Sequence, residues 1–286
     1  MSLVIPLLVE IILAATVATY AAACGLFLAY LSHDRFARAG TLAPRVLLVG
    51  TLLHAVHITA SSFVFHVCPV EGIHFALSTA SMLACAIYLT LRRRYRIDVV
   101  GAFVAPLALV FLLASSLVAM SQPDPRYRRA ILPIHVAANL LGDALFMLAF
   151  AAAVAYLLQE RRLKQKNLAG FFRKLPPLDA LDKAGHRFLL AGFPLLTTGI
   201  LTGVYWAHGV EAGTAADVAR AVFGYTTWLL FAGVLLLRAG AGWRGRRAAY
   251  GTIAGFGFAV LVLIVYLVKS TPAAPPVAVA VAVAVQ

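Results

Sequence analysis

Eight histidines are the residues of this 286-residue chain with the widest chemical scope. Neutral imidazole is a common ligand for iron and other transition metals. The sequence around the histidines holds no phosphate-binding glycine loop, no dinucleotide fingerprint, no HExxH motif and no obvious nucleophile–base–acid set. The three cysteines form no CxxC pair. The motif content therefore favours binding through imidazole over hydrolysis or phosphoryl transfer, and we predict that the protein is not an enzyme.

The composition places these histidines in a membrane protein. Hydrophobic residues make up 62% of the chain and charged residues 12%, whereas a soluble domain carries about 25% charged residues. Apolar runs long enough to cross a hydrocarbon core of ~30 Å recur eight times, and within lipid each must be helical. We predict an all-α, polytopic membrane bundle over residues 1–270, with a low-complexity Pro/Ala/Val tail at 271–286. Nucleic-acid binders, secreted disulfide scaffolds and ordinary cytosolic enzymes are excluded. The eight predicted spans are 3–30, 46–65, 73–91, 99–120, 133–158, 188–207, 221–237 and 248–268.

The distribution of basic residues predicts the orientation of the bundle. Cytoplasmic loops of membrane proteins are enriched in Lys and Arg. Nineteen of the 24 Lys and Arg residues follow the first, third, fifth and seventh spans. This bias predicts that those four loops are cytoplasmic and that both termini lie outside the cytoplasm. The first span has no basic n-region and no small-residue cleavage site, so we expect a retained helix.

The predicted topology sorts the histidines by depth. His66, His74, His135 and His208 fall at the outer ends of their spans, where four imidazoles could bind a metal or haem, or could simply occupy the membrane interface. His54 lies near the middle of the second span.

The three-residue spacing between His54 and His57 places them on roughly one helix face. Ionisable groups at this depth commonly mark functional sites, although the two could also serve as interhelical hydrogen-bonding groups. Asp143 is another charged residue deep within a span, eight residues beyond His135 in the fifth. A pairing of His54 or His57 with Asp143 would satisfy both groups. We also expect 178–185, after the Leu-Pro-Pro sequence at 175–177, to lie along the membrane surface.

Three segments carry a resemblance to a known family. They are LPIHVAANLLGDALFMLAFAAAVAYLLQERRLK at 132–164, LPPLDALDKAGHRFLLAGFPLLTTGILTGVYWA at 175–207 and GWRGRRAAYGTIAGF at 242–256. Their sequence and order resemble the cytochrome c assembly family, the CcsA and CcmC haem-handling proteins. The resemblance implies an outer-face histidine on the helix that holds His135.

Two departures from the family pattern bear on function. Family members that deliver haem to apocytochrome c carry a Trp-rich external segment of the WGxxWxWDPKE type, whereas this chain has HGVEAGTAADVARAVFGYTTW at 208–228. The histidine expected after that segment is also missing, because none follows His208. The chain is therefore most similar to the HemX/YpjD-like branch, in which a histidine in the second helix and one in the fifth match His54 and His135.

The resemblance implies a haem-binding protein of the bacterial inner membrane that takes part in cytochrome c biogenesis. His135 is the first candidate for an axial ligand, and His54, His57 and His208 are the others. Other maturation proteins or haem-biosynthesis enzymes are the expected partners. One alternative is a HemX-like regulator or scaffold of haem biosynthesis that need not bind haem tightly. Another is a small-molecule permease built on intramembrane His and Asp. The candidates for pairing with haem propionates are Arg126, Arg128 and Arg129.

Overall fold

The computed structural model describes residues 4–66, 72–95, 97–117, 131–166, 174–207 and 215–270. Within these ranges all the regular structure is helical, and eight of the helices are long and apolar enough to cross a membrane. The prediction of an all-α membrane bundle is confirmed. The helices are α1 (Val4–Ser32), α2 (Ala37–Phe65), α3 (Gly72–Leu91), α4 (Gly101–Ser116), α5 (Ile131–Lys164), α6 (Leu178–Ala207), α7 (Ala215–Gly240) and α8 (Arg246–Ser270), with 3-10 turns at Asp34–Phe36 and Asp98–Val100.

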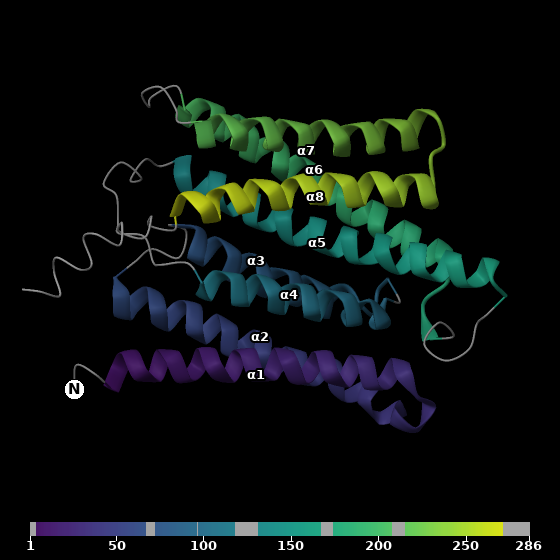
Figure 1. The fold of residues 1–286 in the computed structure, drawn as a ribbon, viewed down its shortest axis with the longest axis horizontal. Helices are drawn as coiled ribbons and strands as arrows, with labels where there is room; N and C mark the ends of the chain where they lie inside the picture. Colours follow the sequence, from purple (N-terminus) through teal and green to yellow (C-terminus); the bar gives the residue numbers. More distant parts are fainter. Residues whose placement is uncertain are drawn as a thin grey trace, which may run out of the picture.

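The helices are arranged as successive antiparallel hairpins along an elongated bundle. In Figure 1 the α1–α2 pair forms one edge, α3 and α4 follow, and α7 lies at the opposite edge beyond α5, α6 and α8. The connections α1–α2, α3–α4, α5–α6 and α7–α8 gather at one end, which we call the basic end because most Lys and Arg residues are there. The start of α1 and the last turn of α8 lie at the other end, the N-terminal end.

The interior of the bundle is aromatic and alanine-rich, and its outside is apolar. Tyr20, Tyr88, Phe146 and Phe231 are fully buried, while leucines such as Leu201 stand mostly exposed on the helix exteriors. Large exposed hydrophobic side chains on every side suit contact with lipid tails. Of the eight helices α5 is the most buried and α7 the least. Side chains on α5 are therefore surrounded by neighbouring helices that can fix their orientation.

The structure corrects one predicted feature of α6. Residues 178–185 do not form a separate surface segment but are the first two turns of α6. The carbonyl of Pro177 accepts hydrogen bonds from the amides of Ala180 and Leu181 and so starts the helix. The reason for the continuity is an apolar stripe at helical spacing that continues into the span, all of it buried. Its members are Leu181, Ala184, Phe188 and Leu189.

The second helix also begins earlier than predicted, at Ala37 instead of 46. The basic residues Arg38 and Arg45 indicated a loop, but the helix runs through both and also through Pro44. Ala43 and Pro44 are buried, and long Arg side chains can reach the interface from a helix that extends past the hydrocarbon. Proline is tolerated in membrane helices because neighbouring groups satisfy the backbone around it.

Candidate functional site

His135 lies near the start of α5, at the N-terminal end of the bundle, and its ring is fixed against α6. Its Nδ1 is 2.9 Å from the carbonyl oxygen of Gly199 and 3.1 Å from the hydroxyl oxygen of Thr202. A carbonyl can only accept, and the Thr202 hydroxyl already donates to the carbonyl of Thr198 at 2.7 Å. Nδ1 must therefore carry the ring proton and donate it, which leaves the lone pair of neutral His135 on Nε2.

The second nitrogen of His135 is covered by one neutral amide. Nδ2 of Asn139 donates to Nε2 of His135 at 3.1 Å and to the His135 carbonyl at 2.9 Å. Metal-binding histidines typically donate one ring N–H to a carbonyl or carboxylate and ligate through the other nitrogen. His135 has this arrangement, and the neutral amide of Asn139 occupies the position at Nε2 that a metal would take.

Two glycines of α6 let this pair approach the α6 backbone. A Cβ at Gly199 would overlap the side-chain amide of Asn139, and a Cβ at Gly203 would come within 3.0 Å of Cε1 of His135. The four-residue spacing of Gly199 and Gly203 is the small-xxx-small pattern of close helix packing. The glycines therefore create the depression on α6 in which the His135 ring lies.

His54 lies in the interior of the bundle with both ring nitrogens engaged. Nδ1 is 3.1 Å from the hydroxyl of Tyr20 on α1, and Nε2 is 2.8 Å from the hydroxyl of Ser78 on α3. The side chain is completely buried. Ligation of a metal through either nitrogen would break one of these bonds. The geometry is that of an interhelical hydrogen-bonding group joining three helices.

His57 and His74 differ from His54 because each uses one nitrogen only. Nδ1 of His57 donates to the carbonyl of Val9 at 3.3 Å, and Nδ1 of His74 donates to the carbonyl of Ser115 at 2.8 Å. Both side chains are buried. Their Nε2 atoms hydrogen-bond to no other residue that the structure describes. His57 is thus better placed than His54 to offer a lone pair inside the bundle.

Asp143 does not form the pairing that the sequence suggested. Its side chain is half-buried on α5, and within the described parts of the chain neither His54 nor His57 hydrogen-bonds to it. The other predicted site residues, Arg126, Arg128, Arg129 and His208, lie outside the described residues.

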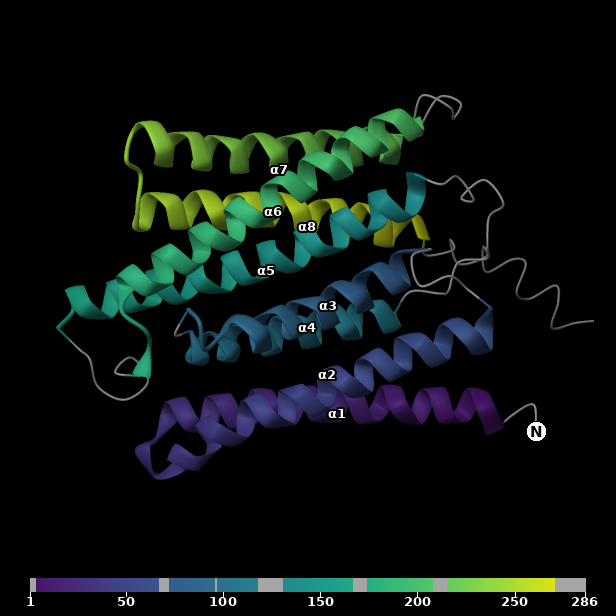
Figure 2. The same cartoon turned by 180° about the vertical axis from the view of Figure 1, so that it is seen from behind.

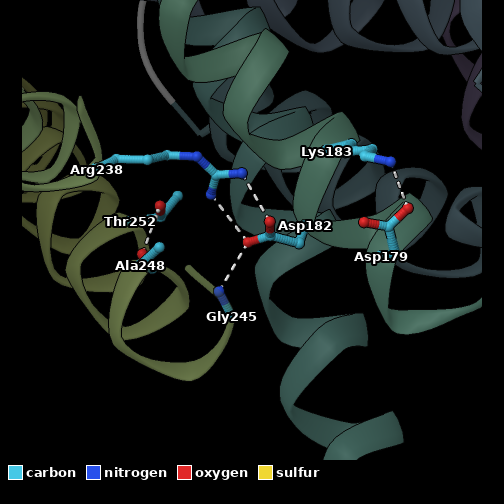
Figure 3. A network of polar contacts seen from close by, with 7 residues as sticks. All are labelled: Asp179, Asp182, Lys183, Arg238, Gly245, Ala248 and Thr252. Atoms are coloured by element: carbon cyan, nitrogen blue, oxygen red, sulfur yellow. Dashed lines mark hydrogen bonds and ion pairs between the residues drawn. The ribbon is translucent and has the colours of Figure 1, made fainter. Parts of the chain in front are cut away.

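A charged network joins three elements at the basic end (Figure 3). The guanidinium of Arg238 on α7 donates to both carboxylate oxygens of Asp182 on α6, at 2.9 and 2.6 Å. The backbone amide of Gly245, between α7 and α8, donates to the same carboxylate at 2.9 Å. The side chains of Arg238 and Asp182 are only 11% and 12% exposed. Sequence reasoning overlooked this pair, because nothing local connects positions 56 residues apart.

A model of the family described as "Cytochrome C assembly protein" matches residues 67–273. The chain belongs to the cytochrome c assembly protein family. The match includes His135, Asn139 and the glycines of α6, as well as the Asp182–Arg238 pair. It leaves out α1 and all of α2, the helix that carries His54 and His57. The site around His135 is therefore part of the family's matched region, and the α1–α2 hairpin lies outside it.

Curated relatives in this family bear the name cytochrome c biogenesis protein CcsA. The one from Guillardia theta is 29% identical over 211 residues, which cover 66% of this chain and 68% of the relative. The one from Prochlorococcus marinus (strain MED4) is 26% identical over 199 residues, covering 61% of this chain and 63% of the relative. The chain thus spans about two thirds of the length of these relatives. The finer assignment to the HemX/YpjD-like branch stays a prediction.

Proposed function

We propose that this multi-pass membrane protein binds haem as cargo during cytochrome c biogenesis and ligates it through Nε2 of His135. Membership of the cytochrome c assembly family supports the process, as does the name of the curated relatives. The observation that carries the ligand assignment is the fixed tautomer of His135, with Nδ1–H bound by Gly199 and Thr202. No bond of the cargo needs to be broken by this chain.

The residues around His135 fit an axial ligand to iron. The carbonyl of Gly199 holds the ring in one orientation and increases the electron density on Nε2. Asn139 satisfies that nitrogen through a neutral hydrogen bond, which costs less to break than an ion pair would. Since the side chain of His135 is only partly buried, a ligand can reach it from the N-terminal end. The predicted Arg126, Arg128 and Arg129 remain candidates for the propionates.

The test is the haem content of the purified protein. We expect a Soret band in the wild type and its loss or strong reduction in His135→Ala, because alanine offers no lone pair. Free imidazole should restore the band in His135→Ala. The control is His33→Ala, since His33 is an exposed histidine at the basic end and is not among the candidate ligands, so this variant should keep the band.

Two results would contradict the proposal. If His135→Ala keeps its full Soret band without imidazole, another residue ligates the iron, and His57 and His74 become the next candidates. If the wild type is colourless and binds no added haem, a HemX-like regulatory role explains the fold better. We further propose that the membrane is the bacterial cytoplasmic membrane, as the family resemblance implies, and the relatives from Prochlorococcus support a bacterial setting.

A further inference from the structure

Asn139 lies one helical turn beyond His135 on α5, and its side-chain amide makes two hydrogen bonds to that residue. One goes to Nε2 at 3.1 Å and the other to the backbone carbonyl at 2.9 Å. Bonds to a carbonyl one turn back are common for short polar side chains in membrane helices, and Thr197 and Thr202 on α6 form the same kind. The bond to Nε2 is different, because it occupies the lone pair with which the ring could bind iron.

The amide of Asn139 is held in this position by α6. Figure 2 shows α5 and α6 running side by side through the bundle, and no other helix pair in the described ranges packs as extensively. A Cβ at Gly199 would overlap Oδ1 and Cγ of Asn139, so a glycine here makes room for the amide. The carbonyl of Gly199 also accepts the Nδ1 proton of His135 at 2.9 Å. Gly199 therefore positions both the ring and the amide, and the bond between them is pre-formed.

Iron and the Asn139 amide compete for Nε2, because neutral imidazole has a single lone pair there. Ligation breaks the hydrogen bond between Asn139 and Nε2, and the free energy of that bond is subtracted from the free energy of haem binding. The net contribution of a neutral hydrogen bond corresponds to about a two- to tenfold change in an equilibrium constant. The amide nitrogen cannot replace imidazole as a ligand, since its lone pair is delocalised into the carbonyl. Asn139 thus lowers the haem affinity of the site without binding iron.

We propose that Asn139 is a positioning residue that competes with iron for Nε2 of His135 and so keeps haem binding weak enough for release. The proposal rests on the proposed function, because it concerns the same ligand and the same cargo. When haem leaves, the amide returns to Nε2, and the ring nitrogen is again hydrogen-bonded. A protein that hands haem on gains from this competition, because tight ligation would retain the cargo.

The experiment measures the haem affinity of the full-length protein in detergent, with ferric haem titrated in and the Soret band recorded. Asn139→Ser removes the amide but keeps a hydroxyl that can bond to the His135 carbonyl, whereas Asn139→Ala removes both bonds. Both variants lose the competing N–H, so both should bind haem about two- to tenfold more tightly than the wild type. The Soret maximum should stay at the wild-type wavelength, because His135 remains the ligand. A merely structural role for Asn139 would weaken binding instead.

Asn139→Asp separates the effect of the hydrogen bond from the effect of side-chain size. Asp has the shape of Asn, but an ionised carboxylate only accepts hydrogen bonds, so it favours a proton on Nε2 and removes the lone pair. We expect this variant to bind haem about tenfold or more weakly than the wild type. The matched control is Thr198→Ala, since Thr198 is an exposed residue of α6 whose hydroxyl donates within the helix to the carbonyl of Pro194. It should leave the haem affinity unchanged.

The proposal and the proposed function fail in different ways. Equal haem affinities for the wild type, Asn139→Ser and Asn139→Asp overturn the competition, as does weaker binding in both Asn139→Ser and Asn139→Ala. If His135→Ala loses haem while the Asn139 variants match the wild type, His135 stands as the ligand and only the role of Asn139 is wrong. If His135→Ala binds haem with the wild-type affinity, the ligand assignment is wrong, and the competition for Nε2 is wrong with it.

Discussion

At the level of single residues, the deepest histidine, His54, and the proposed ligand, His135, differ in their hydrogen bonds. Each ring nitrogen of His54 hydrogen-bonds to a hydroxyl group, and the side chain has no exposed surface. Nε2 of His135 instead accepts one hydrogen bond from the neutral amide of Asn139. Depth in the membrane marked His54 as the more unusual residue. In the structure His54 joins α1, α2 and α3 through its two hydrogen bonds, and we propose the half-exposed His135 as the ligand.

This difference predicts that His54 matters for stability more than for haem at the outer site. Tyr20→Phe should cost about 0.5–1 kcal/mol, because it removes one interhelical hydrogen bond in lipid. His54→Ala should cost about 2–4 kcal/mol, because it strands the hydroxyls of Tyr20 and Ser78 and leaves a cavity. The measurement is unfolding in mixed detergent micelles, with Tyr225→Phe, an exposed tyrosine, as the control. A His54→Ala protein of wild-type stability that has lost its Soret band would refute this division of roles.

Sequence reasoning found His135 but not the atoms that make it a candidate ligand. Its position in the span and the family resemblance singled it out. Thr202 and Gly199 are more than 60 residues away and come into contact only through the packing of α5 on α6. Asn139 could have been noticed, since it lies one turn further along the same helix face. The pairing of His54 with Asp143 failed because depth alone does not say which faces of two helices meet.

At the level of helices, hydrophobicity located all eight spans but misplaced several ends. The apolar runs in the sequence mark the part of each helix that lies inside the hydrocarbon core. Helices such as α2 and α6 continue beyond it into the membrane–water interface, where they carry charged residues. The charges at the start of α6 have a structural use there. Asp182 binds Arg238 and the amide of Gly245, so one carboxylate holds α6, α7 and the start of α8 together.

The helix contacts predict a large effect for Asp182 and a small one for its neighbour. Asp182→Asn should lower the stability by about 3 kcal/mol, because it strands the largely buried guanidinium of Arg238. Asp179→Asn should cost less than about 1 kcal/mol, since the Lys183–Asp179 pair is solvent-exposed. Thermal unfolding of the two variants, which differ in position by one helical turn, compares them directly. Equal unfolding temperatures for the two variants would show that the Asp182 network does not hold the three helices together.

At the level of the whole molecule, the proposed haem ligand and the charged network occupy opposite ends of one bundle. His135 lies at the N-terminal end, and the Asp182–Arg238 pair lies at the basic end. An even number of spans places the N-terminus and the end of α8 on the same side of the membrane. The side of the membrane on which His135 would bind haem therefore depends on which end of the bundle faces the cytoplasm.

The basic loops predict that the basic end is cytoplasmic, and the native thiols allow a direct test. Cys24 and Cys85 are buried and should not react with a membrane-impermeant maleimide. Cys68, which lies outside the described residues, belongs to a predicted outer loop and should be labelled in intact cells. Cys68→Ser should abolish this labelling. Adding Leu117→Cys, at an exposed position at the N-terminal end, should restore it, whereas adding Lys166→Cys at the basic end should give labelling only after permeabilisation. The reverse pattern would place His135 on the cytoplasmic side and the Asp182–Arg238 network on the outer side.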